Sequence, residues 1–307
     1  MADRGAVAAV AADLQRWYRR LGRGLPWRRT TDPYEVLVAE LMLQQTQVAR
    51  VIPRYGAWLK EFPTLATLAK APRASVLRAW QGLGYNRRAV YLHTLAREVS
   101  AAGGALPATT AELVALPGIG PYTAAAVACF AHGAAVAPMD VNALRVLHRL
   151  RGRRGLPPKQ ASPRTQLEGD ALVGAGPPRE LANALMDLGA TVCTPRAPAC
   201  PRCPLRGHCR GVRAGTVAST VRPHRRRGQG TTMPFERTDR YLRGEVVRRL
   251  IAAGPGRHDQ RRLLASWPAL GRAPSRARLE RIVSALSAEG LLQRSRGRVW
   301  LWLPEGD

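Results

Sequence analysis

Four cysteines near residue 200 form the densest group of potential metal ligands in the sequence. Six, two and five residues separate successive members of this group. Four thiolates in so short a segment fit either a tetrahedral structural zinc or a cubane iron–sulfur cluster, and the spacing alone leaves both open. His208 offers a substitute ligand, although four thiolates already complete either shell. The candidate metal ligands are Cys193, Cys200, Cys203 and Cys209.

A single carboxyl group, Glu40, interrupts an apolar run that extends from Val36 to Leu43. Asp32 and Pro33 precede this run with the residue types of an N-cap and a first helical position, so we predict a helix that continues to Gln47. If most faces of that helix are buried, the pKa of Glu40 is raised and the carboxyl can deliver a proton near neutrality. The alternative is a glutamate at the solvent-exposed edge of an amphipathic helix.

A second carboxyl group, Asp140, stands directly before a helical apolar pattern that begins at Val141. An aspartate in this position caps the N-terminus of a helix. A capping carboxylate can also carry chemistry, so the two interpretations do not exclude each other.

The segment Leu116–Thr123 reads Leu-Pro-Gly-Ile-Gly-Pro-Tyr-Thr and lies between two predicted helices. Thr109 and Glu112 form a capping box for the first helix, and an Ala-rich run forms the second. Gly118 and Gly120 permit positive φ values and the close approach of another backbone, and the second helix presents N-terminal N–H groups behind them. Such a corner suits a phosphate group.

Two other segments carry polar side chains of the kind that contact nucleic acids. Gln45 and Thr46 lie in a Gln-Gln-Thr-Gln sequence at a helix end, where uncharged side chains can hydrogen-bond base edges; a solvated helix end is the alternative. Arg87 and Arg88 begin a helix after a glycine-containing turn. They are typical phosphate ligands, although a solvated first turn has the same composition.

The composition points to a polyanionic partner. The formal charge is +27 and the sequence pI is near 11.5, so an acidic ligand such as nucleic acid is favoured. No apolar run reaches the length of a membrane span, and the N-terminus lacks a signal peptide, so we expect a cytoplasmic, nucleoid-associated bacterial protein with no membrane partner. Clustered cysteines in that compartment favour a metal or cluster over disulfides.

Helical patterns continue through the chain, with two helices predicted between residues 64 and 99 and others near residues 142–150 and 179–188. Residues 215–234 are rich in Thr, Ser, Gly and Arg, with a basic run at His224–Arg227, and are predicted to be a linker. Residues 235–307 show three helical patterns and then an alternating hairpin pattern around Ser295–Gly297, which is typical of a winged helix. The predicted fold class is mainly α.

The hairpin, Asp140 and the cysteine spacing together resemble the endonuclease III superfamily of helix-hairpin-helix DNA glycosylases. Within it, four segments are similar to the MutY-type adenine DNA glycosylases over roughly residues 10–212. The segments are Leu25–Trp27, Glu40–Val48, Gly82–Tyr85 and Met186–Ala190. This resemblance implies a two-lobed fold with a six-helix domain at residues 27–135 and a cluster domain formed by residues 1–26 and 136–214. The sequence patterns add a linker at 215–234 and a winged-helix-like domain at 235–307.

The resemblance also implies roles for individual residues. Glu40 would protonate the departing adenine, Asp140 would stabilise the cationic sugar, and Asn142 would orient the carboxylates, a division of labour that matches glycoside hydrolysis. Tyr122 would add an active-site hydrogen bond. The base must leave the stack, so Gln45 would enter the duplex and Tyr85 would wedge beside the opposite base. The four cysteines would hold a [4Fe-4S] cluster, and the partner would be duplex DNA with a mismatch or oxidised base, bound by a monomer.

The residue at position 122 predicts whether the enzyme cleaves the DNA strand after it removes the base. Strand-nicking relatives have a lysine there for Schiff-base chemistry, whereas this chain has Tyr122, so we predict a monofunctional glycosylase that leaves an abasic site. Val141 stands where adenine glycosylases usually have glycine, and Asn86 where they usually have a second tyrosine. The winged-helix pattern replaces the usual Nudix-like domain that recognises 8-oxoguanine.

These departures keep other functions open. A thymine or uracil mismatch glycosylase of the same superfamily is the first alternative, because Asn86-Arg87-Arg88 is similar to the corresponding segment of those enzymes. A non-catalytic protein that binds DNA structures or lesions is the second. The combination of four residues argues against it: Glu40, Tyr122, Asp140 and Asn142. A winged-helix regulator with an iron–sulfur sensor leaves the hairpin unexplained.

Overall fold

The computed structural model describes residues 4–221, 234–267, 274–295 and 300–304. The chain forms two compact units, each assembled from two stretches of sequence. Unit 1 comprises Met1–Leu37 and Pro107–Gly228, and unit 2 comprises Val38–Leu106 and Gln229–Asp307. A compact unit and a family domain need not share boundaries, so the predicted domain limits remain a prediction.

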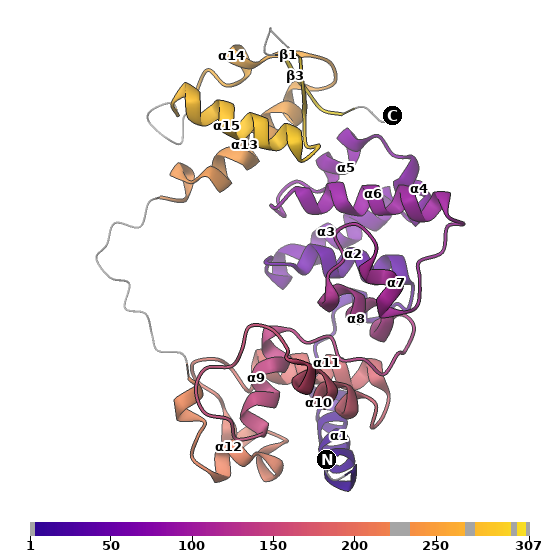
Figure 1. Ribbon diagram of the computed structural model, residues 1–307, viewed down its shortest axis with the longest axis vertical. Helices are drawn as coiled ribbons and strands as arrows, with labels where there is room; N and C mark the ends of the chain where they lie inside the picture. Colours follow the sequence, from indigo (N-terminus) through magenta and orange to yellow (C-terminus); the bar gives the residue numbers. More distant parts are fainter. Residues whose placement is uncertain (1–3, 222–233, 268–273, 296–299, 305–307) are drawn as a thin grey trace. The chain divides into compact units, whose positions relative to one another are not determined.

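Unit 1 is helical and is built around α11 (Figure 1). α11 packs against α1, α8, α9 and α10, and it buries Leu181, Leu185 and Leu188. Each leucine removed from water in this way stabilises the fold by roughly 1.5–3 kcal/mol. Short 3₁₀ turns occur at Pro26–Arg28, Cys200–Arg202, Arg206–His208 and Ala218–Thr220. The helices are α1 (Arg4–Leu21), the start of α2 (Pro33–Leu43), α7 (Thr110–Val114), α8 (Pro121–Phe130), α9 (Val141–Leu150), α10 (Pro163–Val173), α11 (Pro178–Thr191) and α12 (Arg210–Arg213).

The predicted helix starts of unit 1 are confirmed by their caps. The Asp32 carboxylate accepts the N–H groups of Tyr34 and Glu35 at 2.8 and 3.0 Å. The Thr109 hydroxyl accepts the N–H of Glu112 at 3.3 Å, which completes the predicted capping box. Both helices therefore begin where the side-chain acceptors satisfy main-chain donors that the helix itself leaves unpaired.

The first part of unit 2 contains the rest of α2 and four helices that surround an aromatic core. Trp58 and Trp80 meet edge to face with ring centroids 5.4 Å apart. Leu68 of α4 and Leu92 and Leu95 of α6 are fully buried, and these two helices pack against each other. These helices are α3 (Val48–Glu61), α4 (Leu65–Lys70), α5 (Arg73–Ala79) and α6 (Arg87–Ala101).

The second part of unit 2 has the element order of a winged helix, as predicted. The 3₁₀ turn Phe235–Arg237 leads into α13 (Asp239–Ala253), β1 (His258–Asp259), α14 (Gln260–Leu263), α15 (Arg276–Ala288), β2 (Gln293–Arg294) and β3 (Trp300–Trp302). The strands form an antiparallel sheet in the order β1-β3-β2, with His258 opposite Leu301 and Gln293 opposite Trp302. The predicted basic run at His224–Arg227 and most of the predicted hairpin tip lie outside the described residues.

Three helical predictions are corrected by the structure. α2 ends at Leu43 and not at Gln47, because Gln45 adopts a left-handed backbone with φ of 54°. Three helices, not two, occupy residues 64–99, because Pro72 separates α4 from α5. α3 and α10 were not assigned from sequence, although α3 buries Val51, Tyr55 and Trp58 at helical spacing.

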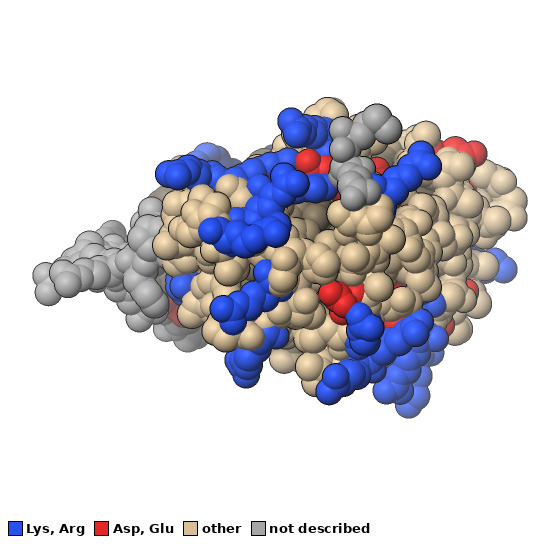
Figure 2. Space-filling model, turned by 90° about the horizontal axis from the view of Figure 1, so that it is seen from below, with Lys and Arg blue, Asp and Glu red and all other residues tan. Residues whose placement is uncertain are grey.

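On the face of the molecule shown in Figure 2, Lys and Arg side chains cover more of the surface than Asp and Glu side chains do, and other residues cover most of it. This distribution agrees with the formal charge of +27 for the whole sequence. Among the helices in the described part of the chain, none is long and apolar enough to cross a membrane.

Candidate active site

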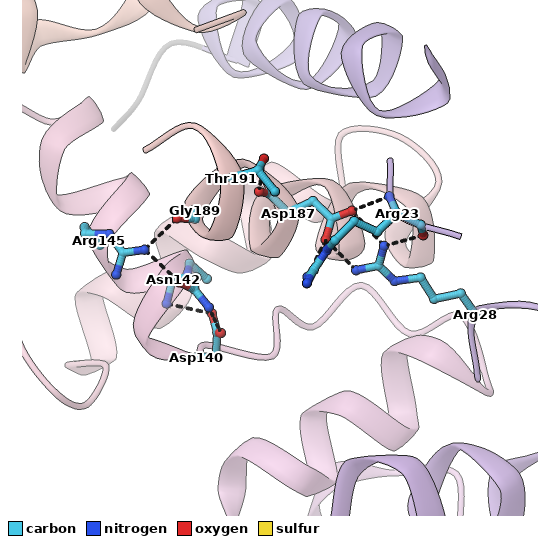
Figure 3. Close-up of polar contacts among 9 residues, drawn as sticks. Arg23, Arg28, Asp140, Asn142, Arg145, Asp187, Gly189 and Thr191 are labelled. Atoms are coloured by element: carbon cyan, nitrogen blue, oxygen red, sulfur yellow. Dashed lines mark hydrogen bonds and ion pairs between the residues drawn. The ribbon is translucent and has the colours of Figure 1, made fainter. Parts of the chain in front are cut away.

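Asp140 caps α9 with both of its carboxylate oxygens engaged (Figure 3). Oδ1 accepts the main-chain N–H groups of Asn142 and Ala143 at 2.9 and 2.7 Å. Oδ2 accepts the side-chain Nδ2 of Asn142 at 2.7 Å. The predicted N-cap is therefore confirmed, and Asn142 holds the carboxylate through its side chain as well as its backbone.

Arg145 fixes Asn142 in turn. Its Nη2 donates to Asn142 Oδ1 and to the carbonyl of Gly189, both at 2.7 Å, and its Nε donates to the carbonyl of Cys193 at 2.7 Å. The side chain is buried, with 6% of the residue exposed. A continuous set of hydrogen bonds thus joins α9, α11 and the start of the cysteine segment to Asp140.

Sequence reasoning missed Arg145. Arg145 follows Asp140 by five residues, but the carbonyls of Gly189 and Cys193 that it also binds lie more than forty residues further along the chain, where local spacing gives no signal.

The environment of Asp140 has two opposing effects on the pKa of its carboxyl group. Burial raises the pKa of the carboxyl, whereas the N–H groups of Ala143 and Asn142, the Asn142 amide and the charge of Arg145 lower it. The net result is a raised pKa in a desolvated carboxyl that is nevertheless fully oriented. A carboxylate of this kind interacts strongly with a positive charge that forms beside it, because little water screens the interaction.

A second buried acid, Asp187 on α11, ties the N-terminal segment to this site (Figure 3). Its two oxygens accept Arg28 Nη1 and Nη2, each at 2.7 Å, and the main-chain N–H and Nε of Arg23 at 2.8 and 2.7 Å. Burial alone raises the pKa of Asp187, but the hydrogen bonds and charges of Arg28 and Arg23 outweigh it and leave the pKa below its usual value. Sequence reasoning assigned no role to this residue.

Gly189, two residues beyond Asp187, allows α11 to approach α9. A Cβ atom at Gly189 would lie 2.6 Å from the Cβ of Asn142 and 2.8 Å from its carbonyl oxygen. Any other residue would push Asn142 aside, so the glycine permits the hydrogen bond between Arg145 and the Gly189 carbonyl.

The predicted hairpin joins α7 to α8. Gly118 has a left-handed backbone with φ of 77°, as its residue type allows, whereas Gly120 has φ of −95° and serves as the N-cap of α8. Tyr122 lies half-buried in the first turn of α8. The helix N-terminus and the glycine turn form the predicted corner, and its proposed phosphate remains a prediction.

In unit 2, Glu40 is buried in α2 with 5% of the residue exposed. It follows Val38 and Ala39 and precedes Leu41, which are all buried. This finding favours the buried-acid interpretation and contradicts a glutamate at a solvent-exposed helix edge.

Gln45 and Tyr85 have φ values of 54° and 48°. In the described part of the chain they are the two residues other than glycine with a left-handed backbone, a conformation that is costly for L-residues and is typical of functional sites. Both are exposed, Tyr85 to 39%, and Thr46 is half-buried next to Gln45. The structure therefore places both predicted DNA-inserting residues on constrained turns at the molecular surface.

The two predicted phosphate ligands at the start of α6 differ in their surroundings. Arg87 is exposed and lies over the ring of Tyr91, with its Cζ 4.9 Å from the ring centroid. Arg88 is buried, and its guanidinium donates to main-chain carbonyls of α2 and of the turn before α6. Arg87 is consequently the accessible candidate for a phosphate contact, and Arg88 has a structural set of partners.

The four candidate cysteines lie in unit 1 as free, half-buried thiols. Arg149, which is 2% exposed, donates to Cys193 Sγ at 3.3 Å and to the carbonyl of Thr194 at 2.7 Å. Burial, together with the charges of the other three cysteines, raises the pKa of the Cys203 thiol to about 11. The four thiols are thus close enough to influence one another.

Within the described residues, no three His, Cys, Asp or Glu side chains converge on one ion position. A cubane cluster distributes its cysteine ligands over four iron atoms, whereas zinc requires its four thiolates around one ion. Four half-buried thiols are a donor set that either group can use.

The family model of the HhH-GPD superfamily base excision DNA repair proteins matches residues 38–168. An adenine DNA glycosylase of Mycolicibacterium smegmatis is 43% identical over 241 residues, which cover 76% of this chain and 78% of that relative. This chain belongs to the MutY-type adenine DNA glycosylases. The resemblance inferred from the hairpin, Asp140 and the four cysteines is confirmed.

Two solved structures are similar to this glycosylase in fold. A thermostable thymine-DNA glycosylase is similar with a TM-score of 0.63 and 30% identity, over 68% of this chain and 98% of that one. A non-covalent endonuclease III–DNA complex shares the fold, with a TM-score of 0.56 and 22% identity over 70% of this chain and 99% of that one. The predicted helix-hairpin-helix glycosylase fold is confirmed, and glycosylases of this family generally carry a [4Fe-4S] cluster.

Proposed function

We propose that this glycosylase acts in base excision repair and hydrolyses the N-glycosidic bond of adenine opposite 8-oxoguanine or guanine in duplex DNA. Asp140, held by Asn142 and Arg145, is the observation that carries the proposal. A desolvated and rigidly oriented carboxylate suits the cationic sugar that forms when the bond to the base breaks.

Glu40 acts as the acid that protonates the leaving adenine. Its burial in α2 supports this role. Once adenine is protonated it can leave as a neutral base, and the proton must come from an acid shielded from bulk water. After the base departs, water adds to the sugar carbon and loses a proton, so that the products are adenine and an abasic site.

The reaction stops at the abasic site. Lysines occur in this chain only at positions 60, 70 and 159, and the hairpin carries Tyr122 in place of the lysine that would form a Schiff base. Tyr122, half-buried on the first turn of α8, contributes a hydrogen bond to the substrate instead.

The protein binds duplex DNA as a monomer, through groups on both units. Gln45, Thr46 and Tyr85 occupy the space of the displaced adenine and the neighbouring stack. Arg87 contacts a phosphate, and the turn at Gly118 and Gly120 binds another at the N-terminus of α8.

A [4Fe-4S] cluster is held by Cys193, Cys200, Cys203 and Cys209. When bound, it would crosslink the cysteine segment, and the carbonyl of Cys193 at the start of that segment accepts a hydrogen bond from Arg145 Nε. Iron and acid-labile sulfide analysis tests this assignment: four of each per chain are expected, whereas one zinc per chain would contradict it.

A thymine or uracil mismatch glycosylase is the second candidate. Asn86 and Val141 favour it, since both differ from the residues usual in adenine glycosylases. The 30% identity to a thymine-DNA glycosylase is lower than the 43% identity to an adenine DNA glycosylase, so adenine remains the first choice.

Single-turnover excision on matched duplexes distinguishes these candidates. The duplexes carry A opposite 8-oxoguanine, A opposite G, T opposite G or U opposite G, and each is developed with and without alkali. We expect cleavage of the adenine duplexes, visible only after alkali. Preferential cleavage of the T or U mismatch would establish the second candidate, and inactivity on every duplex would favour a non-catalytic binding protein.

A further inference from the structure

Gln45 and Tyr85 of unit 2, which have left-handed backbones, lie in separate turns. One buried side chain, that of Arg88, contacts both turns. Gln45 sits in the turn between α2 and α3, and Tyr85 sits in the turn between α5 and α6. Arg88, on the first turn of α6, donates hydrogen bonds to both turns. This side chain is buried, with 7% of the residue exposed.

One terminal nitrogen of Arg88 serves the end of α2. Nη1 donates to the carbonyl oxygens of Leu41, Met42 and Gln44 at 2.5, 3.1 and 2.7 Å. The carbonyls in the last turn of a helix have no partner within the helix, and they carry the negative end of its dipole. A buried cation at this position therefore caps the C-terminus of α2, which ends at Leu43.

The other terminal nitrogen serves both turns. Nη2 donates to the carbonyl of Gly84 at 3.0 Å, to the carbonyl of Leu83 at 3.3 Å and to the hydroxyl of Thr46 at 3.2 Å. The acceptors thus include a residue on each side of Gln45 and the residue directly before Tyr85. The Thr46 hydroxyl also lies 3.4 Å from the Leu83 carbonyl, which links the turns directly.

Aromatic contacts complete this arrangement. The Arg88 Cζ lies 5.4 Å from the ring centroid of Trp80 and 5.5 Å from that of Tyr85. Trp80 Nε1 donates to the carbonyl of Gly84 at 3.2 Å. Although burial lowers the pKa of Arg88 to about 10, the guanidinium remains charged at neutral pH.

Left-handed conformations of residues other than glycine persist only where the surroundings hold them. The two terminal nitrogens of Arg88 have six acceptors, two at the end of α2 and four in the two turns, which is more than a simple surface arginine engages. A lysine has only three donors to replace the planar fork of the guanidinium. We infer that Arg88 is a positioning residue that sets the backbones of Gln45 and Tyr85 as one preorganised element for entry into DNA. This inference rests on the proposed function, which makes those two side chains the groups that enter the duplex.

A double-mutant cycle tests the inference. Arg88→Gln and Arg88→Lys are made in the wild-type chain and in a chain that carries Gln45→Ala with Tyr85→Ala. Dissociation constants are measured on a duplex with an abasic-site analogue opposite 8-oxoguanine, and single-turnover excision is measured on A opposite 8-oxoguanine. Coupled residues show non-additive effects, whereas independent ones add.

In the wild-type background we expect each Arg88 substitution to weaken duplex binding and slow excision by roughly tenfold. In the background that lacks both inserting side chains, the same substitution should change either quantity by less than about twofold. Equal losses in the two backgrounds would overturn the inference, because Arg88 would then act without Gln45 and Tyr85.

Leu68→Ala serves as the control for lost stability. Leu68 is fully buried in α4, and its truncation leaves a cavity remote in sequence from both turns. Its thermal midpoint should fall, while duplex binding well below that midpoint should match wild type. If Leu68→Ala reproduced the binding loss of Arg88→Lys at a comparable midpoint, stability would explain both and the inference would fail. Failure of the proposed function has a different signature, since the wild-type chain itself would then leave adenine in place.

Discussion

At the scale of single residues, Asp140 has more partners than a helix cap requires. An N-cap needs one side-chain oxygen, yet the second oxygen of Asp140 accepts the Asn142 amide, which Arg145 holds in place. The same burial that raises the pKa of this carboxyl removes the water that would screen its charge. The position therefore combines a structural role, which any capping residue could fill, with the electrostatic role that we propose for it, which needs a carboxylate.

Asp140→Asn separates these roles. Asparagine is an equally good N-cap, so we expect α9 and the affinity for duplex DNA to be retained, whereas excision should slow by roughly a thousandfold because the negative charge is lost. Single-turnover excision and duplex binding measure the two effects. Asp170→Asn is the matched control, since the Asp170 carboxylate also accepts a main-chain N–H, that of Ala137 at 2.8 Å, and we expect its excision rate to stay near wild type. Wild-type excision by Asp140→Asn would contradict the proposed mechanism.

At the scale of elements, the distance between α9 and α11 depends on Gly189. Because an added Cβ would overlap Asn142, we expect Gly189→Ala to destabilise the fold by about 1–3 kcal/mol and to reduce excision even where the protein remains folded. Gly56→Ala is the control, because Gly56 lies inside α3 with open space around it. That change should stabilise the protein by up to about 1 kcal/mol through helix propensity. Chemical denaturation should give stability changes of opposite sign for the two variants. Single-turnover excision measures the activity lost in Gly189→Ala.

The ion pairs of Asp187 join the N-terminal segment to α11 and give stability a pH dependence. The folded-state pKa of Asp187 lies below its unfolded value, so its contribution is present above about pH 4 and is lost as the pH falls through the folded-state pKa. We expect Asp187→Asn to cost about 3–5 kcal/mol at pH 7, because Arg28 remains buried, and to cost progressively less below pH 4. Denaturation curves across this pH range test the prediction. Asp239→Asn, which breaks an exposed pair with Arg278, should cost less than about 1 kcal/mol.

Sequence patterns predicted the parts of this fold that depend on neighbours along the chain. Asp32, Thr109 and Asp140 act as caps where their spacing placed them. The sequence left open whether Glu40 is buried or lies at a solvent-exposed helix edge, and the structure buries it. The end of α2 was predicted wrongly, because it depends on Arg88, more than forty residues away. Arg145 was missed for the same reason, since two of its partners are the distant main-chain carbonyls of Gly189 and Cys193, which carry no residue identity.

At the scale of the whole molecule, the winged helix reaches the turn that carries Tyr85. Arg240 of α13 lies over the Tyr85 ring, with its Cζ 4.2 Å from the ring centroid. Both residues belong to unit 2 although 155 positions separate them in sequence. The winged helix can therefore influence the base pair that we propose Tyr85 to contact.

Arg240→Ala tests this influence. A cation–π contact contributes about 0.5–2 kcal/mol, so we expect the affinity for a duplex with 8-oxoguanine to fall by roughly two- to thirtyfold. The single-turnover rate at saturating enzyme should change little, because Arg240 does not contact Glu40 or Asp140 in the proposed mechanism. Arg257→Ala is the matched control, since Arg257 makes a similar contact with Trp302 at 4.9 Å and its removal takes away the same charge. If both variants lost affinity equally, general electrostatics would explain the effect; a loss confined to Arg240→Ala would make the winged helix a partner of Tyr85 in recognising the base opposite adenine.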